Sequence, residues 1–114
     1  MRRHPLPLLL ALAGLATAVP PGPALAGRPE VRIVIKDHRF SPDEVTIPAD
    51  TKVTLVIENQ DRTPEEFESH DLGREKIVPG TGRIVVFVGP LKPGRYEFFG
   101  EFNPSTARGW LVVK

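Results

Sequence analysis

Hydrophobic and polar residues alternate along most of the chain beyond residue 30. In residues 31–36 (VRIVIK) every second side chain is apolar, and residues 52–59 (KVTLVIEN) repeat this pattern. Residues 95–102 (RYEFFGEF) alternate again, whereas residues 84–90 (IVVFVGP) are more continuously apolar. A period of two predicts β-strands that turn one face toward a core.

Turn-forming residues separate these predicted strands. Pro93 and Gly94 suit a type II turn. Tyr96 follows at the position of a tyrosine corner, in which the hydroxyl bonds to an upstream backbone group. We count seven or eight short strands and find no helical stretch. The sequence therefore predicts an all-β fold, a Greek-key β-sandwich of seven or eight strands.

The N-terminal segment follows a different pattern. Arg2 and Arg3 precede a run rich in leucine and alanine, and residues 24–26 read Ala-Leu-Ala. A charged start, a short apolar run and an A-x-A site are typical of a secretory signal peptide, although the paired arginines leave twin-arginine export open. We expect residues 1–26 to be cleaved and residues 27–114 to form one periplasmic or otherwise exported domain that is not an integral membrane protein.

Composition excludes several kinds of chemistry. The chain contains no cysteine, and its one methionine is Met1, so thiolate nucleophiles, sulfur metal ligands and disulfides are all ruled out. Lys plus Arg number 15 and Asp plus Glu number 14, which gives no electrostatic reason to expect nucleic acid. No Ser-His-Asp spacing, phosphate-binding glycine loop or HExxH motif is present. The sequence indicates a binding protein rather than an enzyme.

The stretch RTPEEFESHD (residues 62–71) carries the most distinctive chemistry. If this stretch is extended, Phe67 points one way and Glu66, Glu68 and His70 point the other. Two interpretations stay open. The carboxylates and the imidazole hold a metal ion, or they form the solvated face of an edge strand, where exposed glutamates are ordinary.

Longer segments resemble a known family. FSPDEVTIPADTKVTLVIENQD resembles the opening half of cupredoxin domains, and PLKPGRYEFFGEFNPSTARGWLVV resembles the closing half. PEEFES, LGREKIVPG and YEFFGEFNPSTARG look most like the EfeO-type cupredoxin-like group, which comprises small exported domains associated with bacterial iron uptake. The resemblance covers roughly residues 31–114. It implies a cupredoxin-like sandwich whose partners are an iron-transport membrane permease or other exported iron-uptake components.

The positions that carry copper ligands in blue-copper cupredoxins hold other residues here. The resemblance places the first histidine at Glu65 or Glu66, the cysteine at Gly100, the second histidine at Asn103 and the methionine near Ala107. A blue-copper centre needs a thiolate and two imidazoles. We therefore expect no type 1 copper, and no blue-copper electron carrier.

The resemblance also implies that EEFES and the loop EFNPSTA lie at the same pole of the fold. Oxygen donors with one imidazole suit Fe(III), Fe(II), Mn(II) or Cu(II) better than Cu(I), and the iron-uptake setting favours an Fe or Cu ion. His38 is an alternative second imidazole. The metal site expected at this pole is formed by Glu66, Glu68, His70, Glu101 and Asn103.

Three functional hypotheses follow, in this order. The first is an exported accessory protein that binds a metal ion through carboxylates and assists bacterial iron uptake. The second is a metal-free protein-interaction module of a transport system. The third is a copper-dependent ferrous iron oxidase, which would make the protein an enzyme. The metal, the partner and the oligomeric state are left open by the sequence.

Overall fold

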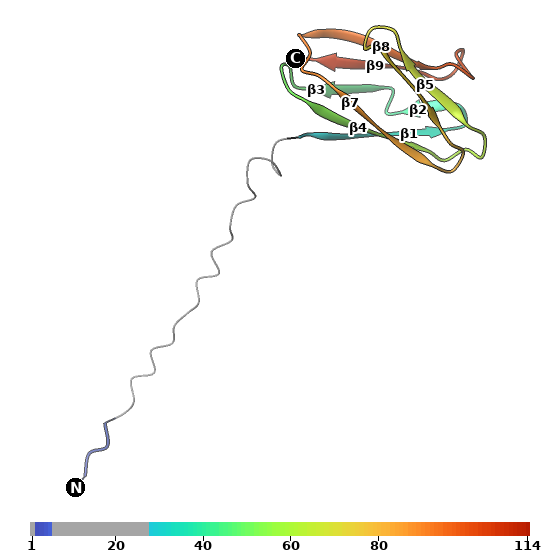
Figure 1. Ribbon diagram of the computed structural model, residues 1–114. Helices are drawn as coiled ribbons and strands as arrows, with labels where there is room; N and C mark the ends of the chain where they lie inside the picture. Colours follow the sequence, from blue (N-terminus) through green and yellow to red (C-terminus); the bar gives the residue numbers. More distant parts are fainter. Residues whose placement is uncertain (1, 6–27) are drawn as a thin grey trace.

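The chain folds into two β-sheets that pack face to face (Figure 1). The structure is a computed structural model that describes residues 2–5 and 28–114. The predicted signal peptide and its cleavage site lie almost wholly outside these residues. Residues 28–114 contain nine strands and no helix, so the described part of the chain offers no helix that could cross a membrane.

The first sheet has the strand order β2-β1-β4-β7. Its strands are β1 (Glu30–Lys36), β2 (Arg39–Ser41), β4 (Val53–Asn59) and β7 (Arg83–Val88). The second sheet has the order β3-β9-β8-β5-β6. Its strands are β3 (Glu44–Ile47), β5 (Glu65–Ser69), β6 (Arg74–Val78), β8 (Gly94–Gly100) and β9 (Arg108–Val113).

The chain crosses repeatedly between the sheets, as in a Greek key. β4 lies in the first sheet and β5 in the second, β7 returns to the first, and β8 goes back to the second. The pairs β1–β4 and β3–β9 are parallel, and all other pairings are antiparallel. The predicted β-sandwich is therefore confirmed. The strand that the sequence pattern missed is β2, which has only three residues and pairs with β1.

The predicted alternation fills the core. Ile33 and Ile35 of β1 and Leu55 and Ile57 of β4 have no exposed surface. Burying each such side chain stabilises the fold by about 1.5–3 kcal/mol. Between the sheets, the ring centroid of Phe40 lies 6.3 Å from that of Phe67 and 5.0 Å from that of Phe98, and the centroids of Phe67 and Phe98 are 5.4 Å apart.

The predicted tyrosine corner is also present. The hydroxyl of Tyr96, near the start of β8, donates a hydrogen bond of 2.8 Å to the backbone carbonyl of Lys92. This bond fixes the turn that leads into β8. At the far end of β8, opposite the C-terminus in Figure 1, the chain turns through residues 101–107 into β9. Two of the candidate residues, Glu101 and Asn103, lie in this turn, and the N–H of Glu101 connects it to β5.

Candidate functional site

Strand β5 presents two chemically different faces. Glu65, Phe67 and Ser69 are buried, whereas Glu66 and Glu68 are partly exposed on the outer face of the second sheet. This division confirms the predicted alternation around Phe67. It also separates two neighbouring carboxylates, because Glu65 points inward and Glu66 outward.

Four glutamates from three segments gather outside the sheet, and we call Glu66, Glu68, Glu75 and Glu101 the acidic cluster. One carboxylate oxygen from each of Glu66, Glu68 and Glu75 lies within 4.8 Å of the others. Glu75 is on β6, directly opposite Glu68 in the antiparallel register. The backbone N–H of Glu101 donates to the carbonyl of Glu66 at 2.9 Å, which holds the β8–β9 loop against β5.

Hydrogen bonding, desolvation and neighbouring charges raise the pKa values of two members of the acidic cluster, Glu66 and Glu68. A hydrogen bond that the protonated Glu66 carboxyl donates to the Glu75 carboxylate raises the pKa of Glu66 to about 7, and desolvation and the charges of Glu75, Glu68 and Glu101 act in the same direction. Desolvation, followed by the charges of Glu101 and Glu75, raises the pKa of Glu68, which His70 partly opposes. A cation among these groups would relieve the repulsion, and clustered groups with shifted pKa values mark a candidate functional site.

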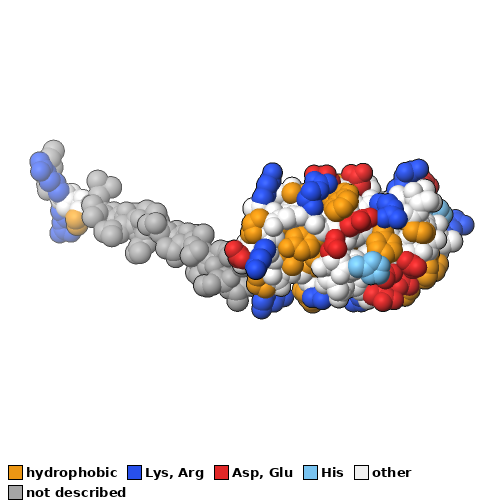
Figure 2. Space-filling view, turned by 90° about the horizontal axis from the view of Figure 1, so that it is seen from above, with side chains coloured by type: hydrophobic (Ala, Val, Ile, Leu, Met, Phe, Trp, Pro, Cys, Tyr) orange, Lys and Arg blue, Asp and Glu red, His pale blue; other side chains and the backbone are white. Residues whose placement is uncertain are grey.

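His70 borders the acidic cluster. Its Nδ1 lies 3.8 Å from Oε1 of Glu68, and its ring centroid lies 5.3 Å from that of Phe99. Figure 2 shows Asp and Glu side chains gathered beside a histidine on one face of the molecule. The side chain of His70 is 77% exposed, so it is free to turn toward an ion.

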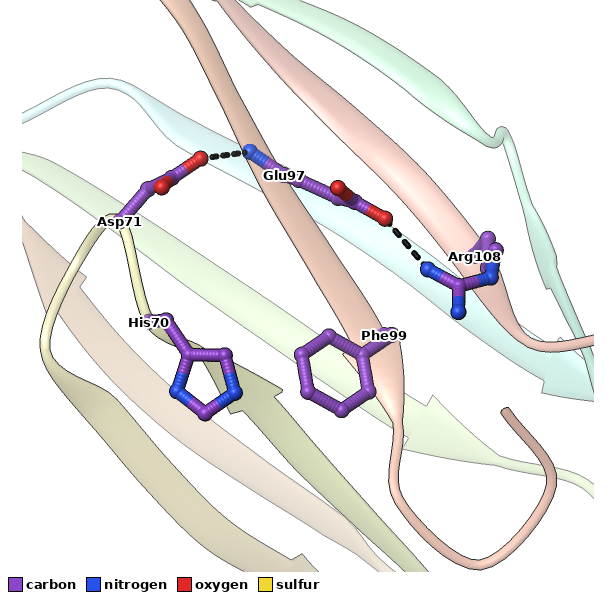
Figure 3. Close-up of a pocket in the computed structure, with 5 residues that line it drawn as sticks. All are labelled: His70, Asp71, Glu97, Phe99 and Arg108. Atoms are coloured by element: carbon purple, nitrogen blue, oxygen red, sulfur yellow. Dashed lines mark hydrogen bonds and ion pairs between the residues drawn. The ribbon is translucent and has the colours of Figure 1, made fainter.

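A shallow hollow of about 290 Å³ lies on the other side of His70 (Figure 3). Oδ2 of Asp71 accepts a 2.8 Å hydrogen bond from the Glu97 backbone N–H, and Oε1 of Glu97 pairs with Nη1 of Arg108 at 2.5 Å. The guanidinium of Arg108 also lies 5.8 Å from the ring centroid of Phe99. These acidic groups already have partners, so the acidic cluster is the better place for a cation.

The inner carboxylate has a different environment. Glu65 is only 1% exposed. Its Oε1 accepts hydrogen bonds of 2.9 Å from the backbone N–H groups of Glu66 and Phe102, and its Oε2 accepts one of 2.7 Å from Nδ2 of Asn103. The side-chain amide of Asn103 therefore binds the buried carboxylate of Glu65 and not the acidic cluster.

The structure thus brings together four of the five residues predicted for the metal site, Glu66, Glu68, His70 and Glu101. Asn103 lies apart from them, on the inner side of the loop. The sequence prediction missed Glu75, because its place opposite Glu68 depends on how β5 and β6 pair. The alternative ligand His38 pairs elsewhere, with its Nδ1 3.6 Å from Oδ2 of Asp61.

The four positions assigned to blue-copper ligands do meet in space. A Cβ atom on Gly100 would lie 2.6 Å from Cδ of Glu65 and 2.7 Å from Cβ of Ala107, and Asn103 bonds to the same carboxylate. None of these residues carries a thiol, thioether or imidazole, and a carboxylate fills the space. The residues present therefore do not fit type 1 copper.

The two-sheet fold and this converging pole define a cupredoxin-like class of protein without the blue-copper donor set. The family described as "Cupredoxin-like domain" matches residues 8–113, and the chain belongs to this family. It is 55% identical over 84 residues to the uncharacterized protein RP394 of Rickettsia prowazekii (strain Madrid E), a match that covers 74% of this chain and 67% of that protein.

Solved structures show the same fold at low sequence identity. Auracyanin A, a "blue" copper protein from Chloroflexus aurantiacus, superposes with a TM-score of 0.67 at 15% identity, over 77% of this chain and all of that chain. The metal-binding domain of the Cu(I)-exporting ATPase CopA from Streptococcus pneumoniae D39 has a TM-score of 0.66 at 16% identity, over 77% and 87% of the two chains. Amicyanin from Paracoccus versutus has a TM-score of 0.60 at 21% identity, over 75% and 81%.

Proposed function

We propose that the protein is an exported accessory that binds an iron or copper ion at its acidic cluster and assists bacterial iron uptake. The observation that carries the proposal is the approach of carboxylate oxygens from Glu66, Glu68 and Glu75 to within 4.8 Å of one another. Glu101 and His70 complete the donor set from the β8–β9 loop and the end of β5.

The chemistry of the donors sets the class of ion. Several carboxylates and one imidazole favour hard and borderline cations, such as Fe(III), Fe(II), Mn(II) and Cu(II). The proton that Glu66 retains near neutral pH would be displaced when a cation binds, because both compete for the same oxygens. Ion affinity should therefore rise with pH through about 7.

Calorimetric titration of the purified protein with Fe(III) and with Cu(II) tests the binding. We expect one ion per chain, and a loss of affinity of roughly tenfold or more in each of Glu66→Ala, Glu68→Ala and Glu75→Ala. The matched control is Glu44→Ala, an exposed glutamate on β3 that faces Arg95 instead. Equal affinity in the wild type and all three cluster variants would contradict the proposal.

Iron uptake and export are proposed from the resemblance to EfeO-type domains and from the signal-like residues 1–26. Iron accumulation in cells that lack the protein tests this role. The wild-type chain should restore iron accumulation, and a Glu66→Ala, Glu68→Ala double variant should not. A chain lacking residues 1–26 should remain in the cytoplasm and restore nothing. Full restoration by that chain would contradict an exported site of action.

A second candidate function is a metal-free interaction module of a transport system. It is favoured by Phe102, which follows Glu101 directly in the β8–β9 loop and is 49% exposed. An apolar ring beside carboxylates is a suitable anchor for a partner protein. The wild type would then show no ion binding above background in calorimetry, and Phe102→Ala would still reduce iron accumulation. Stoichiometric ion binding by the wild type would contradict a metal-free module.

A further inference from the structure

The buried carboxylate of Glu65 joins two segments that are far apart in the sequence. It sits at the start of β5 and accepts hydrogen bonds from Phe102 N–H and Asn103 Nδ2, both in the loop after β8. A third bond comes from the N–H of Glu66, within β5. Removing a carboxylate from water is costly unless it is well hydrogen-bonded, and hydrogen bonds to a charged oxygen are about twice as strong as neutral ones.

The loop that Glu65 holds is organised around Asn103. The backbone carbonyl of Asn103 accepts hydrogen bonds from the N–H groups of Thr106, at 3.2 Å, and Ala107, at 2.9 Å. Its own N–H donates to the carbonyl of Gly100 at 3.1 Å. Because the side chain of the same residue donates to Glu65, one carboxylate anchors residues 100–107 to β5.

The absence of a side chain at Gly100 makes room for this carboxylate. A Cβ atom there would come within 2.6 Å of Cδ and 2.8 Å of Oε1 of Glu65, closer than real Cβ contacts allow. The small side chain of Ala107 borders the same space. Glu65 and Gly100 are therefore sterically matched, and the pole between the two segments is filled by protein atoms.

We propose that the Glu65 carboxylate is a metal-independent lock that takes the place of a bridging ion at this pole and closes the pole to metals. It holds β5 and the β8–β9 loop together through its hydrogen bonds from Phe102 N–H and Asn103 Nδ2. The space that it fills is bordered by Gly100 and Ala107, which, like Asn103, stand at positions that the resemblance gives to copper ligands. This inference does not depend on ion binding at the acidic cluster.

Thermal unfolding and amide hydrogen exchange test the lock. Glu65→Ala leaves Phe102 N–H and Asn103 Nδ2 without their acceptor, so we expect the Tm to fall by about 10 °C. The amides of residues 101–107 should exchange at least roughly tenfold faster if that variant is folded. Glu65→Gln keeps an acceptor oxygen, so its Tm should fall by less than half of the decrease in Glu65→Ala. The matched control is Glu68→Ala on the outer face of β5, and an equal Tm change in it and in Glu65→Ala would overturn the lock.

A double-mutant cycle tests the steric match. Gly100→Ala should lower the Tm strongly in the wild type and less in the Glu65→Ala background, because the carboxylate is then absent. Equal losses in both backgrounds would contradict the match between Glu65 and Gly100.

Titration of the wild-type protein with Zn(II), a diamagnetic ion, tests whether the pole is closed. The side-chain amide resonance of Asn103 reports on its bond to Glu65 and should stay in place up to millimolar ion. A saturable shift of that resonance would show an ion entering the pole and would overturn the proposal. The carboxyl resonances of Glu66 and Glu68 report separately on the acidic cluster, so failure of one proposal is distinguishable from failure of the other.

Discussion

At the scale of single residues, the carboxyl group of Glu66 makes the stability of the folded protein depend on pH. Its pKa of about 7 lies above the ordinary value of 4.5, because Glu75 shares a hydrogen bond with it and other carboxylates stand nearby. Between these two pH values the folded protein binds more protons at this site than the unfolded chain does. Stability from this group is therefore present at low pH and is lost as the pH rises through about 7.

This linkage gives the first prediction. In the absence of metal, the Tm of the wild type should fall between pH 5.5 and pH 8, and the fall should be smaller in Glu66→Gln, which cannot ionise. Differential scanning calorimetry in chelator-treated buffer measures both profiles. The matched control is Glu30→Gln, on the exposed start of β1, which should keep the wild-type slope. The same slope in Glu66→Gln would contradict the assigned pKa.

At the scale of elements, the edge strand β7 of the first sheet could pair with a strand of another chain unless its free backbone groups are covered. β7 is the last strand of that sheet and exposes Val85 and Phe87, the latter to 57%. Side chains from β6 cover part of its backbone, since Nε of Arg74 donates to the Phe87 carbonyl at 3.1 Å and Nζ of Lys76 to the Val85 carbonyl at 3.4 Å. Basic side chains on an edge strand obstruct pairing with another chain.

The second prediction follows from this arrangement. A variant with both Arg74→Ala and Lys76→Ala should aggregate faster than the wild type, because an apolar edge with free carbonyls is then exposed. Light scattering during incubation at 37 °C measures the rate. A variant with Arg62→Ala and Lys92→Ala, both in loops, removes the same charge and should behave as the wild type does. Equal aggregation of the two double variants would show that net charge alone matters.

At the scale of the whole molecule, the aromatic rings of Phe40, Phe67 and Phe98 join the two sheets. Phe40 belongs to β2 of the first sheet, and the other two belong to the second. Single domains are stable by about 5–15 kcal/mol in total. Loss of one central ring should therefore remove a large part of the stability of the sandwich.

The third prediction concerns that ring cluster. Phe98→Ala should lower the free energy of unfolding by about 3–5 kcal/mol, because it leaves a cavity between the sheets. Phe102→Ala makes the same chemical change at a half-exposed ring and should cost within about 0.5 kcal/mol. Urea denaturation followed by fluorescence of Trp110 compares the two variants. Similar costs would show that Phe98 does not carry the contact between the sheets.

Local patterns were sufficient for every described strand except the three-residue β2, and for the outward face of β5. The period of two that places Glu66 and Glu68 together also places Glu65 on the face of Phe67, so the burial of Glu65 had a signal in the sequence. No signal in the sequence identified the hydrogen-bond partners of Glu65, because Phe102 and Asn103 are more than thirty residues away and approach it only in the folded protein. Glu75 was missed for the same reason, because its position depends on strand register.

The side-by-side placement of Glu65 and Glu66 on β5 has a consequence for how this protein can change. Deleting or inserting one residue before β5 would turn every side chain of the strand to the opposite side. Glu66 would then face the interior, and Phe67 would face water. The hydrogen bonds of the buried Glu65 and the outward position of Glu66 therefore depend on the same register of the five residues of β5. A shift of one residue would abolish both at once.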